Sequence, residues 1–361
     1  MADAVFFISF GGPEKSADVM PFLETVTRGR GIPRARLEEV AHHYEAIGGA
    51  SPINAITQRQ AEALQRRLST VGQALPVYVG NRNWHPLIED QLRRMAKIGV
   101  RRAIGFITAA HRAEASLERY IRAVESARSA IGPEAPEIEY VGPWFDHPKF
   151  IEAIAARAEE ALAALDGEAR RNVSWIFTAH SIPCAMAKES TYVIELERTA
   201  SLVAERFGQT RWRLAYSSRS GNPQDAWLEP DVCDEIAAQA QAGARTILIV
   251  PIGFVADHVE VLFDLDIEAK AAADKAGVRL LRAGTVGEHP AFVEMMAEMV
   301  QERLRNDPGA LAVRSSVTRL RDGQSEQSPG QSSDVCYCQP GKSSAPCLRA
   351  CVNARPRSPV A

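Results

Sequence analysis

The stretch VFFISFGGP, Val5–Pro13, decides which fold this sequence is expected to adopt. It runs as an apolar strand into a short turn that ends in proline, and WIFTAHSIP, Trp175–Pro183, repeats that pattern in the second half of the chain. Strands that are apolar at nearly every position are typical of parallel sheets covered on both faces. Similar runs predict eight strands: Ala4–Phe10, Leu75–Val79, Ala103–Ala109, Ile138–Val141, Val173–Thr178, Arg211–Ser217, Thr246–Ile252 and Val278–Arg282.

Longer amphipathic segments separate these runs, so the sequence predicts an α/β protein. Eight strands could form one large sheet or two sheets of four. A second pair of landmarks favours two, because HPKFIE, His147–Glu152, and HPAFVE, His289–Glu294, each follow the fourth strand of a set. We therefore expect two similar α/β halves, residues 1–155 and 156–306, each with a four-stranded parallel sheet, and a tail at 307–361.

Composition and charge exclude several classes of protein. The chain has 361 residues, of which 46% are hydrophobic and 24% charged, values ordinary for a globular protein. Its net charge of −3 gives no global positive field that would recruit nucleic acid. No basic region precedes the first apolar run, and no run reaches the roughly 18 to 20 apolar residues that span a bilayer. A soluble, cytoplasmic protein is the expectation.

The histidine of the second landmark is the first candidate functional residue. In open α/β sheets, ligands bind beyond the carboxyl ends of the strands, and His180 lies directly after an apolar strand. Its imidazole could accept a proton or coordinate a metal near neutral pH, although a structural hydrogen-bonding role is the alternative. No G-x-G-x-x-G follows the first strand and no G-x-x-x-x-G-K-[ST] occurs, so a nucleotide site is unsupported.

A run of acidic residues follows the strand Thr246–Ile252. Glu260, Asp264 and Glu268 recur at intervals of four, which would put them on one face of a helix. Because like charges at this spacing are mildly destabilising, the ridge is either a solvated helix face or a site for a metal cation. We expect His180 and Glu260 to face each other from separate lobes across a cleft, an arrangement suited to proton transfer or metal delivery.

Two glycine-rich segments, Arg28–Gly31 and Tyr44–Pro52, lie near the start of the chain. Glycine turns beside arginines could bind carboxylates or phosphates through paired hydrogen bonds. They could equally be surface loops, and the sequence leaves both interpretations open.

The tail holds four of the six cysteines. Cys336, Cys338, Cys347 and Cys351 form the pattern C-x-C-x8-C-x3-C, which in a cytosolic protein favours metal or iron–sulfur ligation over disulfides. Four thiolates satisfy either a zinc ion or a [2Fe–2S] cluster, and the short paired spacing that zinc favours is missing. Four unbound thiols are the alternative.

Taken together, these residues resemble the ferrochelatases, the chelatases that insert ferrous iron into a porphyrin. The resemblance runs from Val5 to Arg305 and is most specific in AHSIP, Ala179–Pro183, followed by DHVEVLFDLDIE, Asp257–Glu268. It implies two Rossmann-like halves around a porphyrin cleft, and a [2Fe–2S] cluster on the four tail cysteines, because some ferrochelatases carry one near the C-terminus. The resemblance implies that His180 and Glu260 are the catalytic pair and that the metal meets His180, Glu260, Asp264 and Glu268.

The resemblance also implies which porphyrin is used. The segment Ser217–Trp227 is longer than in typical protoporphyrin-using members, which points to coproporphyrin III as substrate and coprohaem III as product. The sequence departs from the family pattern at two places. Phe10 occupies a position where many coproporphyrin enzymes have tyrosine. The turn Ala109–Arg112 also differs, which makes His111 a candidate pocket residue. The residues expected to bind porphyrin are Phe10, Arg28, Arg30, Ser51, Asn54, His111 and Trp227.

Other interpretations stay open at this stage. They are a protoporphyrin IX ferrochelatase giving protohaem, a chelatase for cobalt or nickel, and a haem or porphyrin carrier without chemistry. The pairing of His180 with Glu260 argues against a carrier, because binding alone requires no proton acceptor. The expected partners are a porphyrin and ferrous iron, while membrane association, haem-pathway proteins and a monomeric or dimeric state are left open.

Overall fold

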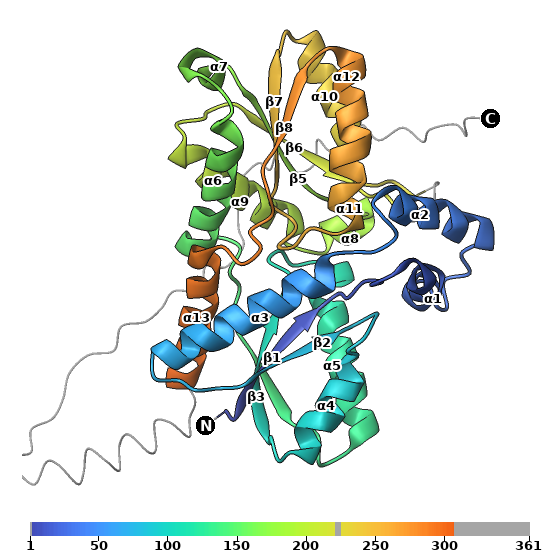
Figure 1. Cartoon of the computed structure of the whole chain (residues 1–361), viewed down its shortest axis with the longest axis vertical. Coiled ribbons are helices and arrows are strands. Elements are labelled where there is room, and N and C mark those ends of the chain that lie inside the picture. Colours follow the sequence, from blue (N-terminus) through green and yellow to red (C-terminus); the bar gives the residue numbers. More distant parts are fainter. Residues whose placement is uncertain (1, 221–224, 307–361) are drawn as a thin grey trace, which may run out of the picture.

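The computed structural model describes residues 2–220 and 225–306 (Figure 1). Its strands form two four-stranded parallel sheets, ordered β2-β1-β3-β4 and β6-β5-β7-β8. All eight predicted strands are confirmed with small shifts at their ends, and so is the prediction of two sheets rather than one. The strands are β1 (Ala4–Ser9), β2 (Val77–Asn81), β3 (Arg102–Ile107), β4 (Glu137–Tyr140), β5 (Ser174–His180), β6 (Trp212–Ser217), β7 (Thr246–Pro251) and β8 (Arg279–Arg282).

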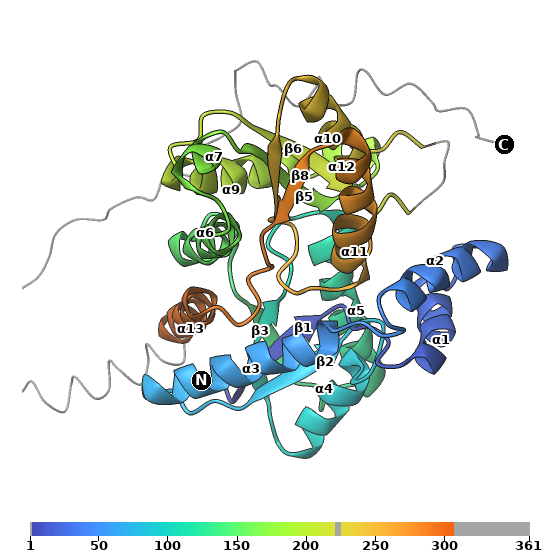
Figure 2. The same ribbon diagram turned by 45° about the horizontal axis from the view of Figure 1, so that its top comes forward.

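Helices cover both faces of each sheet, as the apolar strands require (Figure 2). Helices α3 and α13 pack on one face of the first sheet and α4 with α5 on the other; α6 with α9, and α10 with α12, cover the second sheet. The helices are α1 (Ser16–Val26), α2 (Arg34–Ala46), α3 (Ile53–Thr70), α4 (Ile88–Lys97), η1 (Glu114–Glu118, a π-helix), α5 (Arg119–Ile131), α6 (Pro148–Leu162), α7 (Gly167–Arg171), α8 (Cys184–Lys188), α9 (Tyr192–Arg206), α10 (Val232–Gln241), α11 (Val259–Leu262), η2 (Asp264–Ala269, a π-helix), α12 (Lys270–Ala276) and α13 (Pro290–Arg305).

The two halves exchange their last helices. Helix α6 follows the first sheet but packs on β7, β8 and α9 of the second, whereas α13 follows the second sheet but packs on α3 and β3 of the first (Figure 1). One apolar core therefore runs from sheet to sheet, with Trp144 in contact with the rings of Phe106, Phe150 and Phe292. The division of the chain into 1–155 and 156–306 stays a prediction.

The two exchanged helices begin in the same way. His147 caps α6 and His289 caps α13, and in each case the imidazole Nδ1 accepts a hydrogen bond from the backbone N–H two residues on, at 3.2 Å. Proline follows each histidine at the first helical position, where its missing N–H costs nothing. The HPKFIE and HPAFVE landmarks are therefore equivalent helix starts in two halves of the same topology.

The acidic segment does not form the regular helix that its spacing predicted. Residues 259–276 run as α11, the π-helix η2 and α12, with the Phe263 carbonyl accepting from the N–H groups of Ile267 at 3.1 Å and Glu268 at 2.9 Å. Because an α-helical turn takes about 3.6 residues, a strict four-residue repeat drifts around an α-helix, and one wider turn offsets that drift. The buried apolar residues of this segment keep that repeat: Val261, Leu265, Ala269 and Ala273.

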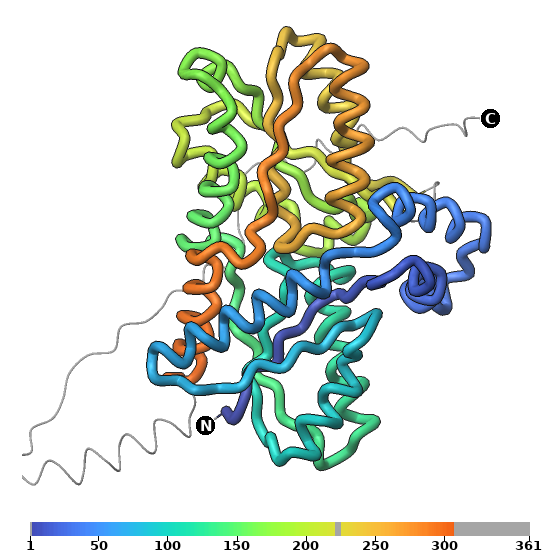
Figure 3. The backbone as a smooth tube through the Cα atoms, viewed as in Figure 1, coloured from blue at the N-terminus to red at the C-terminus, as the bar shows by residue number. Residues whose placement is uncertain are grey.

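Helices α1 and α2, which the sequence did not predict, project beside the junction of the two halves (Figure 3). They pack through a cluster of rings in which Phe22 contacts Phe10, Tyr44 and Trp84. On the other side, His43 of α2 stacks on Phe263 at a centroid distance of 3.8 Å. The segment Arg34–Ala46 thus bridges the first half to the end of α11.

Helix α3 fastens the first half to loops of the second. Gln60 is fully buried, and its amide donates to the carbonyl oxygens of Val255 and Gly287, both at 2.9 Å. Arg59 pairs with Glu288 at 2.7 Å on the surface nearby. Val255 belongs to the loop that follows β7, so this contact fixes the segment leading to Glu260. None of the helices within the described ranges has the length and apolar character of a membrane span.

Candidate functional site

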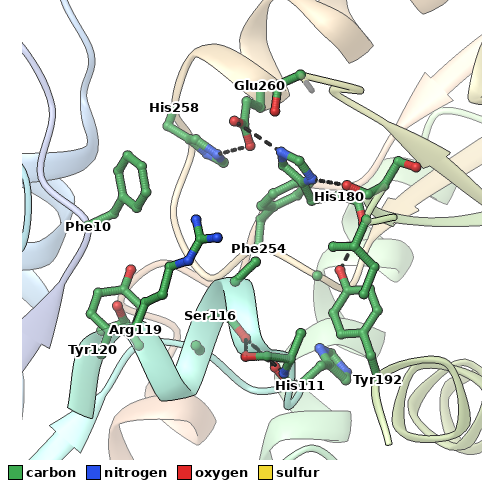
Figure 4. A pocket seen from close by; sticks show the side chains of 18 of the residues that line it. Phe10, His111, Ser116, Arg119, Tyr120, His180, Tyr192, Phe254, His258 and Glu260 are labelled. Atoms are coloured by element: carbon green, nitrogen blue, oxygen red, sulfur yellow. Dashed lines mark hydrogen bonds and ion pairs between the residues drawn. The ribbon is translucent and has the colours of Figure 1, made fainter. Parts of the chain in front are cut away.

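A cavity of about 600 Å³ lies where the carboxyl ends of both sheets meet (Figure 4). Its size falls within the range of roughly 300–1,000 Å³ of small-molecule and cofactor sites. The loops after β1, β2, β3, β5 and β7 all contribute to its wall. Apolar side chains such as Ile53, Ile182 and Phe254 form much of that wall, and a few polar groups converge on the space between them.

His180 and Glu260 meet at this cavity, with His180 Nε2 3.5 Å from Glu260 Oε1. The expectation that the two residues face each other is confirmed, but the expectation that separate lobes supply them is wrong. Both belong to the second half: His180 ends β5, and Glu260 lies in α11 after β7, the parallel neighbour of β5. Gly253 permits this approach, since a Cβ there would lie 2.6 Å from the Cβ of Ala179.

The backbone fixes the tautomer of His180. Its Nδ1 lies against the carbonyl oxygen of Ser181, which can only accept a hydrogen bond, so Nδ1 carries the proton. Nε2 then faces Glu260, and in the neutral ring it bears the free lone pair. Tyr192 O–H donates to the His180 carbonyl at 2.9 Å and holds the end of β5 in place.

The charges of the pair stabilise each other. Burial by itself lowers the pKa of His180, but the Glu260 carboxylate and the Ser181 carbonyl outweigh it and raise that pKa to about 8. Burial likewise raises the pKa of Glu260, but His180 and His258 reverse this and hold that pKa well below its usual range. At neutral pH the resting pair is therefore imidazolium and carboxylate.

His258 is a third member that the sequence analysis left outside the site. Its Nδ1 donates to the carbonyl of Ala256 at 3.1 Å, and its Nε2 lies 3.3 Å from Glu260 Oε2. Glu260 thus sits between two imidazoles, as Figure 4 shows. Its position in the sequence could have identified it as a site residue, because His258 lies two residues before Glu260, at the start of α11.

The acidic ridge runs from the cavity to the surface. Glu260 lines the cavity, Asp264 is buried behind it with a hydrogen bond from Ser218 Oγ, and Glu268 is exposed. Burial, with the Glu260 and Glu268 carboxylates, raises the pKa of Asp264 to about 7 despite the Ser218 hydrogen bond. In the part of the chain that the structure describes, no three or more His, Cys, Asp or Glu side chains form a metal-binding group. A metal role for His180, Glu260, Asp264 and Glu268 stays a prediction.

His111 also lines the cavity, as a neutral and buried imidazole (Figure 4). Burial lowers its pKa to about 3. Its Nε2 lies 2.9 Å from Thr199 Oγ1, whose own O–H points to the Phe145 carbonyl at 2.7 Å. Nε2 therefore donates to Thr199, which ties the loop after β3 to α9.

Three more of the predicted porphyrin-binding residues lie at the cavity wall: Phe10, Arg30 and Trp227. Trp227 is held there by backbone pairing, because Leu228 N–H donates to the Ile182 carbonyl at 3.0 Å and Cys184 N–H to the Ala226 carbonyl at 2.8 Å. Of the loop Ser217–Trp227, residues 221–224 lie outside the described residues.

Arg28, Ser51 and Asn54 do not line the cavity. Arg28 is exposed. Asn54 uses its side-chain amide to clamp the turn after β1, accepting from Gly12 N–H at 3.1 Å and donating to the Gly12 carbonyl at 3.0 Å. Ser51 is buried beside Gly12. For Ser51 and Asn54, these contacts shape the turn that carries Phe10.

The four tail cysteines, Cys336, Cys338, Cys347 and Cys351, lie outside the described residues. The prediction that they bind a cluster is therefore untested by the fold.

The chain is similar to known proteins over most of its length. The ferrochelatase family model matches residues 2–304. A coproporphyrin III ferrochelatase of Mycolicibacterium smegmatis is 44% identical over 85% of this chain and 91% of its own length. A ferrochelatase of Rhodopirellula baltica is 45% identical over 84% of this chain and 86% of its own length.

The fold has a more distant relative among solved structures. The sirohydrochlorin chelatase of Bacillus subtilis subspecies spizizenii superposes with a TM-score of 0.51 at 13% identity, covering 86% of this chain and 98% of the other. That likeness concerns the fold alone. The family match over nearly all described residues, together with two relatives above 40% identity, places the chain in the ferrochelatase family.

Proposed function

We propose that this protein is a coproporphyrin III ferrochelatase, a lyase that inserts ferrous iron into coproporphyrin III and releases coprohaem III. Metal insertion is the reaction that names the family. The observation that carries the proposal for this chain is the His180–Glu260 pair, 3.5 Å apart, at the wall of a cavity of about 600 Å³. A binding protein would not require this pair, whereas metal insertion requires a proton acceptor and a group that attracts a cation.

Metal insertion exchanges one Fe(II) ion for two protons of the pyrrole nitrogens. In the neutral state His180 presents the lone pair of Nε2, because Ser181 holds the proton on Nδ1. It is therefore suited to accept the two pyrrole protons one after the other, passing the first on before it takes the second, and Glu260 stabilises the imidazolium that results each time. Asp264 behind Glu260, with its pKa raised to about 7, is suited to pass protons on toward the surface. The same carboxylates attract the incoming iron.

Coproporphyrin III is favoured as substrate by two observations. Relatives at 42–45% identity carry that substrate in their names, and arginines line one side of the cavity, where the four propionates of this porphyrin would find partners. Protoporphyrin IX, with two propionates, is the second candidate, because the Rhodopirellula baltica relative is named a ferrochelatase without a stated porphyrin.

Anaerobic incubation with Fe(II) tests the proposal, with loss of free-porphyrin fluorescence as the measurement. We expect kcat/KM for coproporphyrin III to exceed that for protoporphyrin IX by at least about tenfold, since each additional charge-assisted contact contributes about 1.5–3 kcal/mol. Faster turnover of protoporphyrin IX would contradict the substrate, faster insertion of cobalt or nickel than of iron would contradict the metal, and binding without insertion would make the protein a carrier.

We also propose that Cys336, Cys338, Cys347 and Cys351 hold a [2Fe–2S] cluster. Their spacing, C-x-C-x8-C-x3-C within a short stretch, supports it, because four thiolates complete the ligand set of such a cluster. The cluster lies outside the described residues, and the insertion steps above do not involve it.

Iron and sulfide analysis of protein purified without oxygen tests the cluster. We expect two irons and two acid-labile sulfides per chain, with visible absorption that is lost in Cys347→Ser while porphyrin binding is retained. A colourless chain free of iron and sulfide would contradict the proposal. One zinc ion per chain in place of iron would show that the four cysteines form a zinc site instead.

A further inference from the structure

Arg282 is the last residue of strand β8, and its guanidinium joins two aspartates from different elements. Its Nε and Nη2 donate to the two carboxylate oxygens of Asp266 at 2.8 and 2.6 Å, and its Nη1 lies 3.4 Å from Asp257 Oδ1. The contact with Asp266 has the paired geometry that makes arginine–carboxylate contacts strong. Burial lowers the pKa of Arg282, but Asp266 and Asp257 outweigh it and raise that pKa. The Arg282 side chain is 17% exposed, so these ion pairs are partly shielded from water.

The two aspartates lie on either side of Glu260 in the chain. Asp257 precedes α11 and Asp266 lies within the π-helix η2, so Glu260 belongs to the segment between them. Arg282 therefore fastens both ends of that segment to β8, and helix α12, which continues η2, packs on the same strand (Figure 1). Because β8 and β5 belong to one sheet, this contact fixes Glu260 relative to His180, the last residue of β5.

The charge of Arg282 does not itself help to attract iron, because like charges repel. Among the described residues, no lysine or arginine forms an ion pair with Glu260, Asp264 or Glu268, the residues of the acidic ridge. Arg282 thus neutralises carboxylates outside the ridge and leaves the charge of the ridge in place. Arg282 does not line the cavity either. An effect of this residue on metal insertion therefore has to come from the position of the segment that it holds.

We propose that Arg282 is a positioning residue for iron insertion, and that it acts by keeping the Glu260 carboxylate beside His180. Glu260 Oε1 lies 3.5 Å from His180 Nε2. The attraction between a carboxylate and an imidazolium falls as their distance grows, so a segment free to move away from β5 loses part of the stabilisation that Glu260 provides. Arg282 prevents this movement by holding the segment at both ends. This inference rests on the proposed function in taking metal insertion as the reaction.

Initial rates of iron insertion into coproporphyrin III test this assignment through the sign of the change. Arg282→Gln removes a cation near the ridge, which by charge alone would favour the approach of Fe(II) and raise kcat/KM. We expect the opposite, a fall in kcat/KM of about threefold to tenfold, the range for loss of a paired but partly exposed ion pair. Asp266→Asn changes the charge in the other sense and should also lower kcat/KM, because it breaks the same paired contact. Arg282→Lys should restore only part of the rate, because lysine keeps the charge but not the paired donors.

A double-mutant cycle with Glu260→Gln separates positioning from a general loss of structure. Because Arg282 acts through the Glu260 carboxylate, Arg282→Gln should lower kcat/KM by less than about twofold in the Glu260→Gln background, since residues that act together are not additive. An equal factor in both backgrounds would overturn the proposal, and so would an unchanged or raised kcat/KM in Arg282→Gln alone. Arg279→Gln is the matched control, because Arg279 begins β8 and donates to the Ala164 carbonyl at 3.3 Å, away from this segment. It should leave the rate unchanged.

Hydrogen–deuterium exchange of the full, metal-free chain measures the fastening without the reaction. In η2 the N–H groups of Ile267 and Glu268 donate to the Phe263 carbonyl. Peptides that contain these amides should exchange about threefold faster or more in Arg282→Gln, because local opening becomes easier, while α13 should be unchanged. Equal exchange in wild type and variant would overturn the proposal. The measurement needs neither iron nor porphyrin, so a wild-type chain that fails to insert iron would contradict the proposed function, and exchange would still decide whether Arg282 fastens the segment.

Discussion

His180→Ala is expected to lower kcat/KM for iron insertion by about 10²–10⁴-fold, the range that a positioned general base contributes. The reason is the lone pair that Nε2 presents in the neutral ring, where the Ser181 carbonyl keeps the proton on Nδ1. No neighbouring residue replaces that lone pair in the same position. His258 directs its Nε2 toward Glu260 from the other side of the carboxylate. Initial rates with Fe(II) and coproporphyrin III, measured without oxygen, give the comparison.

His258→Ala serves as the companion variant. It removes an imidazole that contacts the same carboxylate at 3.3 Å, so a smaller loss than in His180→Ala separates proton acceptance from a general effect on Glu260. Porphyrin binding and thermal unfolding should be close to wild type in both variants. Wild-type turnover in His180→Ala would refute the role assigned to this residue.

Much of the fold was predictable because the strands carry a strong local signal. In β1 all six residues are buried, and a run of that kind has few alternatives to the centre of a parallel sheet. The histidine-capped helix starts were recognisable for the same reason, since His147 and His289 make short-range contacts with their own helices. His180 could be selected because it ends the apolar strand β5, and Glu260 because it lies in the segment that follows β7.

What could not be predicted depends on contacts between distant segments. Nothing in the sequence of α6 or α13 says that each packs on the other half, because an apolar helix face fits either sheet. Asn54 has the chemistry of a propionate ligand, yet the turn at Gly12 takes up its amide. Arg82 follows β2, so the strand-end argument that selected His180 applies to it as well, although no residue of that loop was predicted for the site.

Glu260→Gln is the second variant with a large expected effect, a fall in kcat/KM of about 10²–10³-fold, as is typical when a preorganised electrostatic group is removed. The carboxylate stabilises the imidazolium that forms when His180 takes a proton, and it attracts the cation that replaces that proton. Glutamine retains the shape and loses the charge. Asp274→Asn, an equal loss of charge on exposed α12 away from the cavity, should leave the rate unchanged.

The pH dependence distinguishes loss of charge from loss of shape. In the wild type His180 is protonated below its pKa of about 8 and cannot accept a proton, so kcat/KM should rise with pH and level off above that value. In Glu260→Gln the lowering of this pKa by burial is no longer offset by the carboxylate, so the rising limb should move to lower pH. The maximal kcat/KM of the variant would then be lower than that of the wild type, but the variant would keep its maximal value down to a lower pH. A limb that stays near pH 8 in Glu260→Gln would mean that a group other than His180 titrates there, and the assignment of His180 as the proton acceptor would fail.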